Sequence, residues 1–320
     1  MAERNLIERL DEMIDAIVAG KRAPALEPEL AMFAAIASDL GGLPDPGFKA
    51  RLGRELFGKK EDRMETTITV TGMRPYFIVK GADDLIAFLK QTFDAEVTMR
   101  VPTPQGTVMH AEVRVGDSLL ELGDAGDQWT PIAGPMHVYL ENVDEVYQRA
   151  IAAGARSLSE PVVQPYGDRE AGVVDARGIE WFIATHLEGG PRPAGYGTVT
   201  SGFRAKGAKQ LLEFLQKAFG AVHVSGGMEH AEVRLGETLV EVGEAHGPWG
   251  PTRGAFHLFV SDCDAVYAEA LRAGAAPLYE PEDKPYGERS GGVTDPWGNQ
   301  WYIAGPLSAS RYSSPGARTR

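Results

Sequence analysis

The side chains best suited to chemistry in this 320-residue sequence occur in pairs separated by 120 positions. Glutamates stand at Glu121 and Glu241, and histidines at His137 and His257. Carboxylates and imidazoles are common general acids and bases, and both can bind divalent metals. In LLEL and LVEV the two glutamates alternate with apolar residues, so each points to the opposite face of its strand from those neighbours. These groups therefore recur as parts of a larger repeated unit.

The longest repeated stretch is YGDREAGVVDARGIEWFIA at 166–184, which returns as YGERSGGVTDPWGNQWYIA at 286–304. Solenoid repeats recur about every 20 to 50 residues, so this longer offset indicates duplication of a whole domain. We predict two homologous domains, at 73–188 and 197–307. The Gly- and Pro-containing segment 189–196 is interpreted as their linker.

Each copy shows one pattern twice: a strand, an amphipathic helix and three further strands. In the first copy, strands are expected at 74–79, 96–101, 108–115 and 118–122 and a helix at 82–93; then a strand at 136–141, a helix at 143–153 and short strands around Ser157, Val173 and Trp181. Phe93 lies 17 residues before His110, whereas Phe219 lies 11 before His230, so the second copy has the shorter hairpin. The predicted fold class is α+β, with four βαβββ units forming two tandem domains.

The chain ends lie outside both copies. Residues 1–63 predict three short amphipathic helices, interpreted as a packing or homodimerisation appendage or as a docking module for a partner protein. Residues 308–320 are small, polar and basic, and we expect them to be disordered.

The composition limits the classes of partner and the cellular compartments that we expect for this protein. The chain is 43% hydrophobic and 24% charged, typical of a globular protein, and its net charge of −13 disfavours nucleic acid as a partner. The single cysteine, Cys263, fits a reducing compartment. Neither a membrane span nor a secretory signal is evident, so we expect a cytoplasmic protein.

Several motifs in fixed order carry a family resemblance. MHAEVRVGDS, MHVYLENVDEVYQRAIAAGA and YGDR followed by DARGIEW, with YGER and DPWGNQW in the second copy, resemble the vicinal oxygen chelate superfamily of glyoxalases, bleomycin-resistance proteins and dioxygenases. The final motifs look most like its PhnB-like branch. The resemblance implies paired βαβββ units that curl into a cup for a metal or small ligand. It leaves open an isomerase, a lyase, a dioxygenase or a non-catalytic binding protein.

The resemblance also implies four metal-ligand positions in each cup. They are the first-strand positions at or next to Arg74 and Thr200, the fourth-strand Glu121 and Glu241, the histidines His137 and His257, and the last-strand Phe182 and Tyr302. A guanidinium cannot coordinate a cation, and a phenylalanine has no lone pair. A divalent ion (Zn, Ni, Mn or Fe) is therefore predicted, if anywhere, at Glu241 and His257, and strict glyoxalase I activity is disfavoured.

Without a metal, two function classes remain. In an enzyme, Glu121 with His137 and Glu241 with His257 would act as base and polariser on a carbonyl or hydroxyl substrate. In a drug- or metabolite-sequestering protein, the same groups would only orient the ligand. Arg74 and Phe182 also suggest that the first copy has lost its site and serves as a scaffold.

Two kinds of repeated side chain have both binding and structural interpretations. Trp129 and Trp249 are either a stacking lid over an aromatic ligand or packing residues. Arg169 and Arg289 either clamp a substrate anion or, as we favour, fix a loop by pairing with the aspartates of the same motif, Asp175 and Asp295.

The HAEV motifs contain a further histidine and glutamate each. The glutamate follows two positions after the histidine, which places both on the same face of a strand. We expect them to form surface pairs, His110 with Glu112 and His230 with Glu232.

Overall fold

The computed structural model describes residues 69–126, 129–188, 190–227 and 229–307. The predicted N-terminal helices and C-terminal tail lie outside these residues. Within the described part of the chain, no helix is long and apolar enough to cross a membrane.

The first copy contains the two predicted βαβββ units. Its elements are β1 (Val70–Val79), α4 (Ala82–Phe93), β2 (Glu96–Pro102), β3 (Val108–Val115) and β4 (Ser118–Asp124), then β5 (Met136–Tyr139), α5 (Val143–Ala152), β6 (Arg156–Val163), β7 (Asp168–Val174) and β8 (Glu180–His186). Helix α4 begins after Gly81, whose φ of 76° favours glycine. The Asp124 carboxylate accepts hydrogen bonds from the amides of Gly81 and Ala82 (3.0 and 2.9 Å) and so caps the helix.

The second copy repeats this order. Its elements are β9 (Val199–Ala205), α6 (Ala208–Phe219), β10 (Val222–Gly227), β11 (His230–Leu235), β12 (Thr238–Glu244), β13 (Ala255–Val260), α7 (Cys263–Arg272), β14 (Ala276–Asp283), β15 (Glu288–Thr294) and β16 (Gln300–Pro306). The β10–β11 connection is shorter than the β2–β3 connection, as the spacing of the motifs predicts. The α+β class and the four βαβββ units are confirmed.

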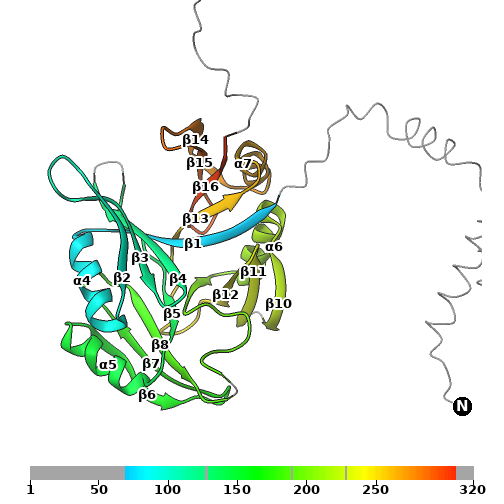
Figure 1. The fold of residues 1–320 in the computed structure, drawn as a ribbon. Helices are drawn as coiled ribbons and strands as arrows, with labels where there is room; N and C mark the ends of the chain where they lie inside the picture. Colours follow the sequence, from blue (N-terminus) through cyan, green and yellow to red (C-terminus); the bar gives the residue numbers. More distant parts are fainter. Residues whose placement is uncertain (1–68, 127–128, 189, 228, 308–320) are drawn as a thin grey trace, which may run out of the picture. The chain divides into compact units, whose positions relative to one another are not determined.

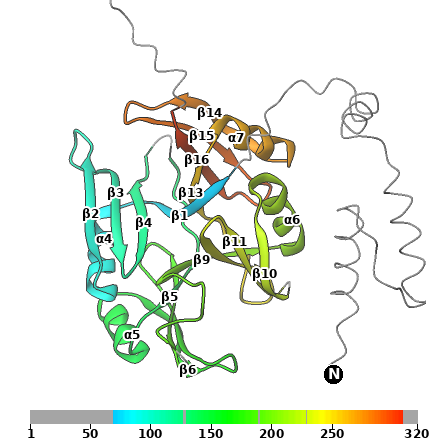
Figure 2. The same cartoon turned by 45° about the vertical axis from the view of Figure 1, so that its right-hand side comes forward.

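The strands form two eight-stranded sheets, and each sheet combines both copies (Figures 1 and 2). Sheet A has the order β14-β15-β16-β13-β1-β4-β3-β2, and sheet B the order β10-β11-β12-β9-β5-β8-β7-β6. The copies meet where β1 pairs antiparallel with β13 and β5 pairs antiparallel with β9. Arg74 lies opposite His257 at the first junction, and His137 lies opposite Thr200 at the second.

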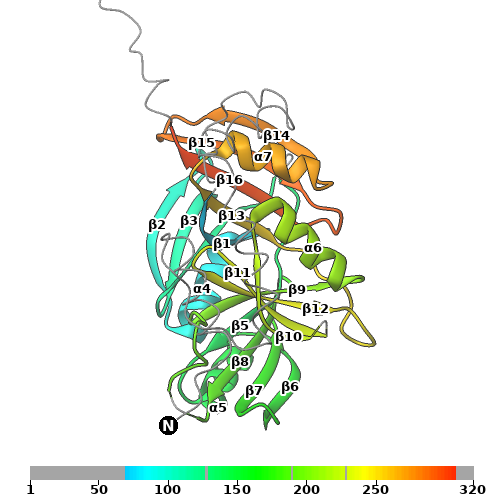
Figure 3. The same cartoon turned by 90° about the vertical axis from the view of Figure 1, so that its right-hand side faces the viewer.

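The hydrophobic cores follow the copies rather than the sheets. One core gathers buried residues of β1–β8 around α4 and α5, and the other is built mainly from β9–β16 around α6 and α7. Figure 3 shows α6 and α7 side by side on the strands of the second copy. Trp181 and Trp301, both fully buried, belong to these two cores. Each copy therefore makes its own core, while sheet pairing joins the copies.

The pairing of strands between the two copies has a physical reason. In one copy alone, β1 and β5 would each present an unpaired edge, and unpaired backbone groups at a sheet edge favour pairing with another chain. Here the second copy supplies β13 and β9 to those edges. The two copies thus pair within one chain.

Candidate active site in two concave sheet faces

Strand alternation puts one set of side chains on the concave face of each sheet, opposite the helices. We call these faces cup A, on sheet A, and cup B, on sheet B. The family's four positions fall in cup A on Arg74, Glu121, His257 and Tyr302 and in cup B on Thr200, Glu241, His137 and Phe182. Each cup draws its glutamate from one copy and its histidine from the other.

This pairing corrects the sequence-based assignment, which joined glutamate and histidine within each copy. Glu121 contacts His257, and Glu241 contacts His137. A metal site formed by Glu241 with His257 is excluded, because these residues lie on different sheets. The scaffold hypothesis for the first copy also loses its basis, since Arg74 and Phe182 belong to different cups. A fixed sequence offset identifies equivalent positions but not spatial neighbours.

Cup A contains a buried carboxylate held by two partners. His257 Nδ1 lies 2.8 Å from Glu121 Oε2, and Arg74 Nη1 donates to Glu121 Oε1 at 3.0 Å. Glu121 is only 1% exposed. Burial opposes its ionisation, but hydrogen bonds and charges from His257 and Arg74 outweigh burial, so the pKa of this carboxyl is lowered. Glu121 therefore stays ionised at neutral pH.

This carboxylate fixes the orientation of His257. With the Nδ1 hydrogen directed at Glu121, the Nε2 atom at the other edge of the ring is left to accept a proton or contact a ligand. Phe259 lies against the imidazole, with ring centroids 4.4 Å apart, and the Arg74 guanidinium lies 4.7 Å from the Phe259 ring centre. The side chain of His257 keeps 19% exposure. It is held by neighbours on two sides yet remains accessible.

Aromatic side chains form a wall of cup A. Tyr302 meets Tyr76 and Trp129 edge-on, with ring centroids 5.5 and 5.7 Å apart, and Trp129 also meets Tyr279 at 6.4 Å. Burial raises the pKa of Tyr279 to about 12 and raises the pKa values of Tyr76 and Tyr302 further, so all three hydroxyls stay protonated. Trp129, 41% exposed, lies at this wall, so the repeated tryptophan does mark a cup residue.

Cup B holds its histidine differently. His137 Nδ1 lies 3.0 Å from Glu241, and Nε2 lies 3.3 Å from Glu170 without hydrogen-bond alignment. Burial lowers the pKa of His137, but the two carboxylates outweigh burial and raise that pKa to about 10. The ring is therefore an imidazolium at neutral pH with both nitrogens facing carboxylates, and it has no lone pair for a proton or a metal.

Aromatic residues also surround cup B. Trp249 meets Phe182 at 5.7 Å, and the guanidinium of Arg204 lies 5.5 Å from the Trp249 ring centre. Tyr139 stacks on His137 at 4.4 Å. Trp249 thus contacts an aromatic residue of the other copy at a cup wall, as Trp129 does in cup A.

The donor sets do not fit a four-ligand divalent ion. In cup A, the position of one expected ligand is Arg74, which neutralises Glu121. In cup B, Phe182 has no donor atom and the nitrogens of His137 are engaged. Among the described residues, no group of three or more His, Cys, Asp or Glu side chains is arranged to hold a metal. The side chains of the two cups therefore do not support a metal-assisted step.

The repeated arginines lie on the helix side of their sheets. Arg169 pairs with Asp144 at 2.7 Å, and Arg289 pairs with Asp264 and with Asp283, the latter at 2.8 Å. The anion-clamp role is therefore not supported. The favoured structural role holds with different partners, because Asp144 and Asp264 are in the first turns of α5 and α7.

The aspartates expected to pair with these arginines fix turns instead. Asp175 accepts hydrogen bonds from the amides of Arg177 and Ile179 (2.8 and 3.0 Å) and from the indole of Trp181 (3.3 Å). Asp295 makes the equivalent three bonds in the second copy. The repeated aspartate-glycine-tryptophan motif thus positions the buried tryptophan of each core.

The HAEV side chains of the first copy do not form the expected pair. His110 Nδ1 contacts the Tyr76 hydroxyl at 3.2 Å, while Glu112 accepts from Arg74 at 3.4 Å. Tyr76 and Arg74 both belong to cup A. His110 and Glu112 therefore extend the polar part of that cup.

The second copy shows the same departure. His230 lies 4.0 Å from Glu241, and Glu232 accepts from the Tyr196 hydroxyl at 3.0 Å. Tyr196 lies in the segment interpreted as the linker, and its ring meets that of His137 edge-on at 6.4 Å. His230 and Glu232 thus belong to the polar part of cup B.

Glu170 is a cup residue that the sequence motifs did not single out. It faces cup B, whereas its second-copy equivalent, Ser290, hydrogen-bonds Tyr279 at 2.9 Å in cup A. The signal is a difference between the repeats, YGDRE against YGERS. Positions that the repeats share identify the cups, and positions that they do not share distinguish one cup from the other.

Paired βαβββ units with polar groups on a concave sheet face define a glyoxalase-type fold, and comparisons with known proteins agree. The model of the Glyoxalase/Bleomycin resistance protein/Dioxygenase superfamily matches residues 70–183 and 200–303, so the chain belongs to this superfamily. The crystal structure of glyoxalase I from Zea mays is similar, with a TM-score of 0.57 at 15% identity, covering 73% of this chain and 92% of that one. At this identity the likeness concerns the fold alone.

Two curated relatives are uncharacterised proteins of mycobacteria. The protein from Mycobacterium bovis is 32% identical over 122 aligned positions, and the match covers 35% of this chain and 80% of the relative. A protein from Mycobacterium tuberculosis shows the same identity over 72% of its length. Each match is about as long as one copy.

Proposed function

We propose that cup A binds a small organic molecule and that His257 is its central polar contact, acting as a general base on an acidic hydroxyl or C–H group. The observation that carries the proposal is the 2.8 Å contact between His257 and a carboxylate that is 1% exposed. A carboxylate on Nδ1 orients the imidazole and stabilises the cation formed when Nε2 takes a proton. Arg74, 3.0 Å from the carboxylate, keeps it ionised.

The aromatic wall indicates the kind of molecule that would fit. Tyr76, Tyr302 and Trp129 present ring edges and faces, which suit a planar or aromatic ligand. Cup B is the weaker candidate for proton transfer, because His137 is already protonated between two carboxylates. The two cups therefore have different roles in this proposal. Cup A binds the ligand and supplies the general base, whereas the polar groups of cup B chiefly form an ion cluster.

Non-catalytic sequestration of the ligand is the competing function, and one variant separates the two. A thermal-shift screen of phenols, enols and aryl ketones identifies a ligand, and chromatography of the incubated ligand shows whether it is converted. Glu121→Gln should abolish conversion while keeping affinity within a few-fold if His257 is a base. If the protein only sequesters its ligand, chromatography should recover the ligand unchanged after incubation with the wild-type protein. Glu241→Gln is the matched control, and loss of ligand binding in that variant alone would assign the site to cup B instead.

A further inference from the structure

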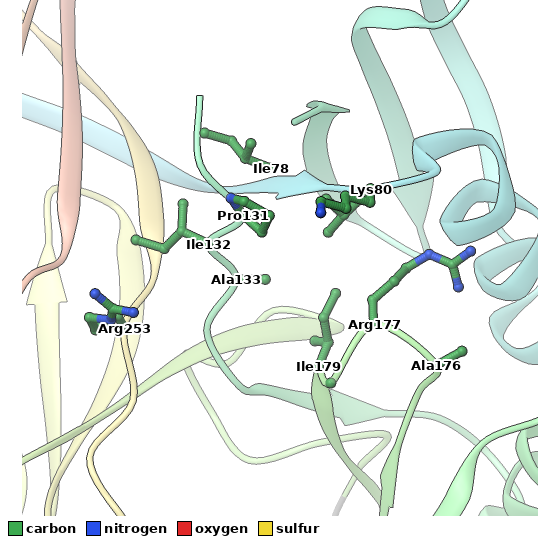
Figure 4. A pocket seen from close by; sticks show the side chains of 11 residues that line it. Ile78, Lys80, Pro131, Ile132, Ala133, Ala176, Arg177, Ile179 and Arg253 are labelled. Atoms are coloured by element: carbon green, nitrogen blue, oxygen red, sulfur yellow. The ribbon is translucent and has the colours of Figure 1, made fainter. Parts of the chain in front are cut away.

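A cavity of about 480 Å³ lies beside cup A (Figure 4). Its wall is formed by the end of β1 and the residue after it (78–80), the connection at 131–133, the turn at 176–179 and Arg253 of the second copy. Its volume falls within the range of small-molecule sites. Ile78 and Ile132 also pack with Tyr302, so the cavity lies next to the aromatic wall of cup A. Both copies contribute to it.

The charge of the wall is unusual for this chain. Three cationic side chains, Lys80, Arg177 and Arg253, line the cavity, and none of its described lining residues is acidic. The chain as a whole carries a net charge of −13. Arg177 is engaged by Asp84 at 2.9 Å, whereas Lys80 and Arg253 have no ion pair with any described residue. Two cations without an ion pair to a described residue therefore border a small cavity.

Apolar side chains supply the rest of the wall. Ile78, Ile132 and Ile179 are 3%, 9% and 1% exposed. In Figure 4 the Lys80 amine and the side chain of Ile179 border the space from opposite sides, with the connection at 131–133 between Lys80 and Arg253. A ligand here would meet positive charge at the rim and hydrocarbon deeper in the wall.

The duplication provides an internal comparison. At the equivalent place in the second copy, Trp297 stands where the first copy has Arg177, and Asn299 stands where it has Ile179. The Trp297 indole donates to the Lys206 carbonyl at 3.0 Å. Asn299 is 1% exposed and accepts from the Gly254 amide at 2.9 Å. A larger side chain and a hydrogen-bonded one thus stand at the equivalent positions of the second copy, where the charge of Arg177 has no counterpart.

We infer that this cavity is a second binding site, for a small organic anion that carries a phosphate or carboxylate on an apolar group. The anionic group pairs with Lys80, and the apolar group lies against the isoleucines, whereas Arg253, beyond the connection at 131–133, contributes only its positive charge. Ions of opposite charge form the stronger class of hydrogen bonds, and the apolar contact adds affinity that inorganic phosphate lacks. The site is independent of the function proposed for cup A.

Isothermal titration with phenyl phosphate and with benzoate tests this inference, with benzyl alcohol as the uncharged probe. We expect both anions to bind, benzyl alcohol to bind at least about tenfold more weakly, and Lys80→Gln to weaken anion binding about tenfold or more. Lys80 is exposed at the end of its strand, so its substitution should leave the fold intact.

Two controls make the outcome decisive. Lys206→Gln removes the same charge at the equivalent position of the second copy, and it should leave anion affinity unchanged. His257→Gln alters cup A and should also leave it unchanged. The inference is overturned if neither anion binds, if Lys206→Gln weakens binding as much as Lys80→Gln, or if His257→Gln abolishes binding and so assigns the anion to cup A.

Discussion

Replacing His137 by glutamine should destabilise the fold more than the same change at His257. In cup B the substitution leaves Glu241 and Glu170, with side chains 14% and 15% exposed, facing each other without the cation between them. Removing one partner of a buried ion pair costs about 3–5 kcal/mol. In cup A, Glu121 keeps Arg74 at 3.0 Å after loss of His257, so the cost is that of one hydrogen bond to a charged group, about 1.5–3 kcal/mol.

These energies translate into measurable melting temperatures. One kcal/mol shifts Tm by about 2–4 °C in domains of this size. His137→Gln should therefore lower Tm by about 6–20 °C, and His257→Gln by about 3–12 °C. Differential scanning calorimetry of the two variants and wild type at pH 7 measures the difference directly.

The pH dependence of Tm shows whether the charge of His137 causes the loss of stability in His137→Gln. The pKa of His137 is raised to about 10 in the folded protein, above its value of about 6.5 in an unfolded chain. The stabilisation is therefore complete below a pH of about 6.5 and is lost as pH rises through about 10. The Tm gap between wild type and His137→Gln should narrow between about pH 7 and pH 10. A constant gap, or a larger loss at His257, would refute the ion-cluster account of cup B.

A fragment of residues 69–188 should form a homodimer in which β1 of one fragment pairs with β5 of a second fragment. A monomeric mass in light scattering would contradict the argument that the unpaired edges of β1 and β5 favour pairing with another chain. Arg74→His supplies a third ligand beside Glu121 and His257, so zinc should bind at about one equivalent in titrations monitored by elemental analysis, whereas Arg74→Gln, which removes the charge without adding a ligand, should not gain it. Gly236→Ala should lower stability by about 1–3 kcal/mol in urea unfolding, because φ is 59° there and a Cβ would lie 2.5 Å from the Val70 carbonyl oxygen; Gly227→Ala, whose Cβ meets nothing within 4 Å, is its control.

The sequence by itself determined the elements and their repetition. Local patterns decide these features: the spacing of Leu85, Phe88 and Leu89 predicted the buried face of a helix at 82–93, and the structure has α4 at those residues. The duplicated motifs likewise determined the number of βαβββ units, and the family resemblance that they carry pointed to Glu121 and His257 as cup residues. Such signals depend on neighbours in the chain, so they need no knowledge of the tertiary structure.

Only the tertiary structure decided which glutamate meets which histidine. Glu121 and His257 are 136 residues apart, and the choice of partner depends on which edge strands pair, a long-range event that a repeat offset leaves open. The same pairing brings Arg253 to a cavity of the first copy and separates Arg74 from Phe182. Backbone pairing between copies is a property of the whole chain, because the unpaired edges of β1 and β5 can be satisfied only by strands that lie elsewhere in the sequence.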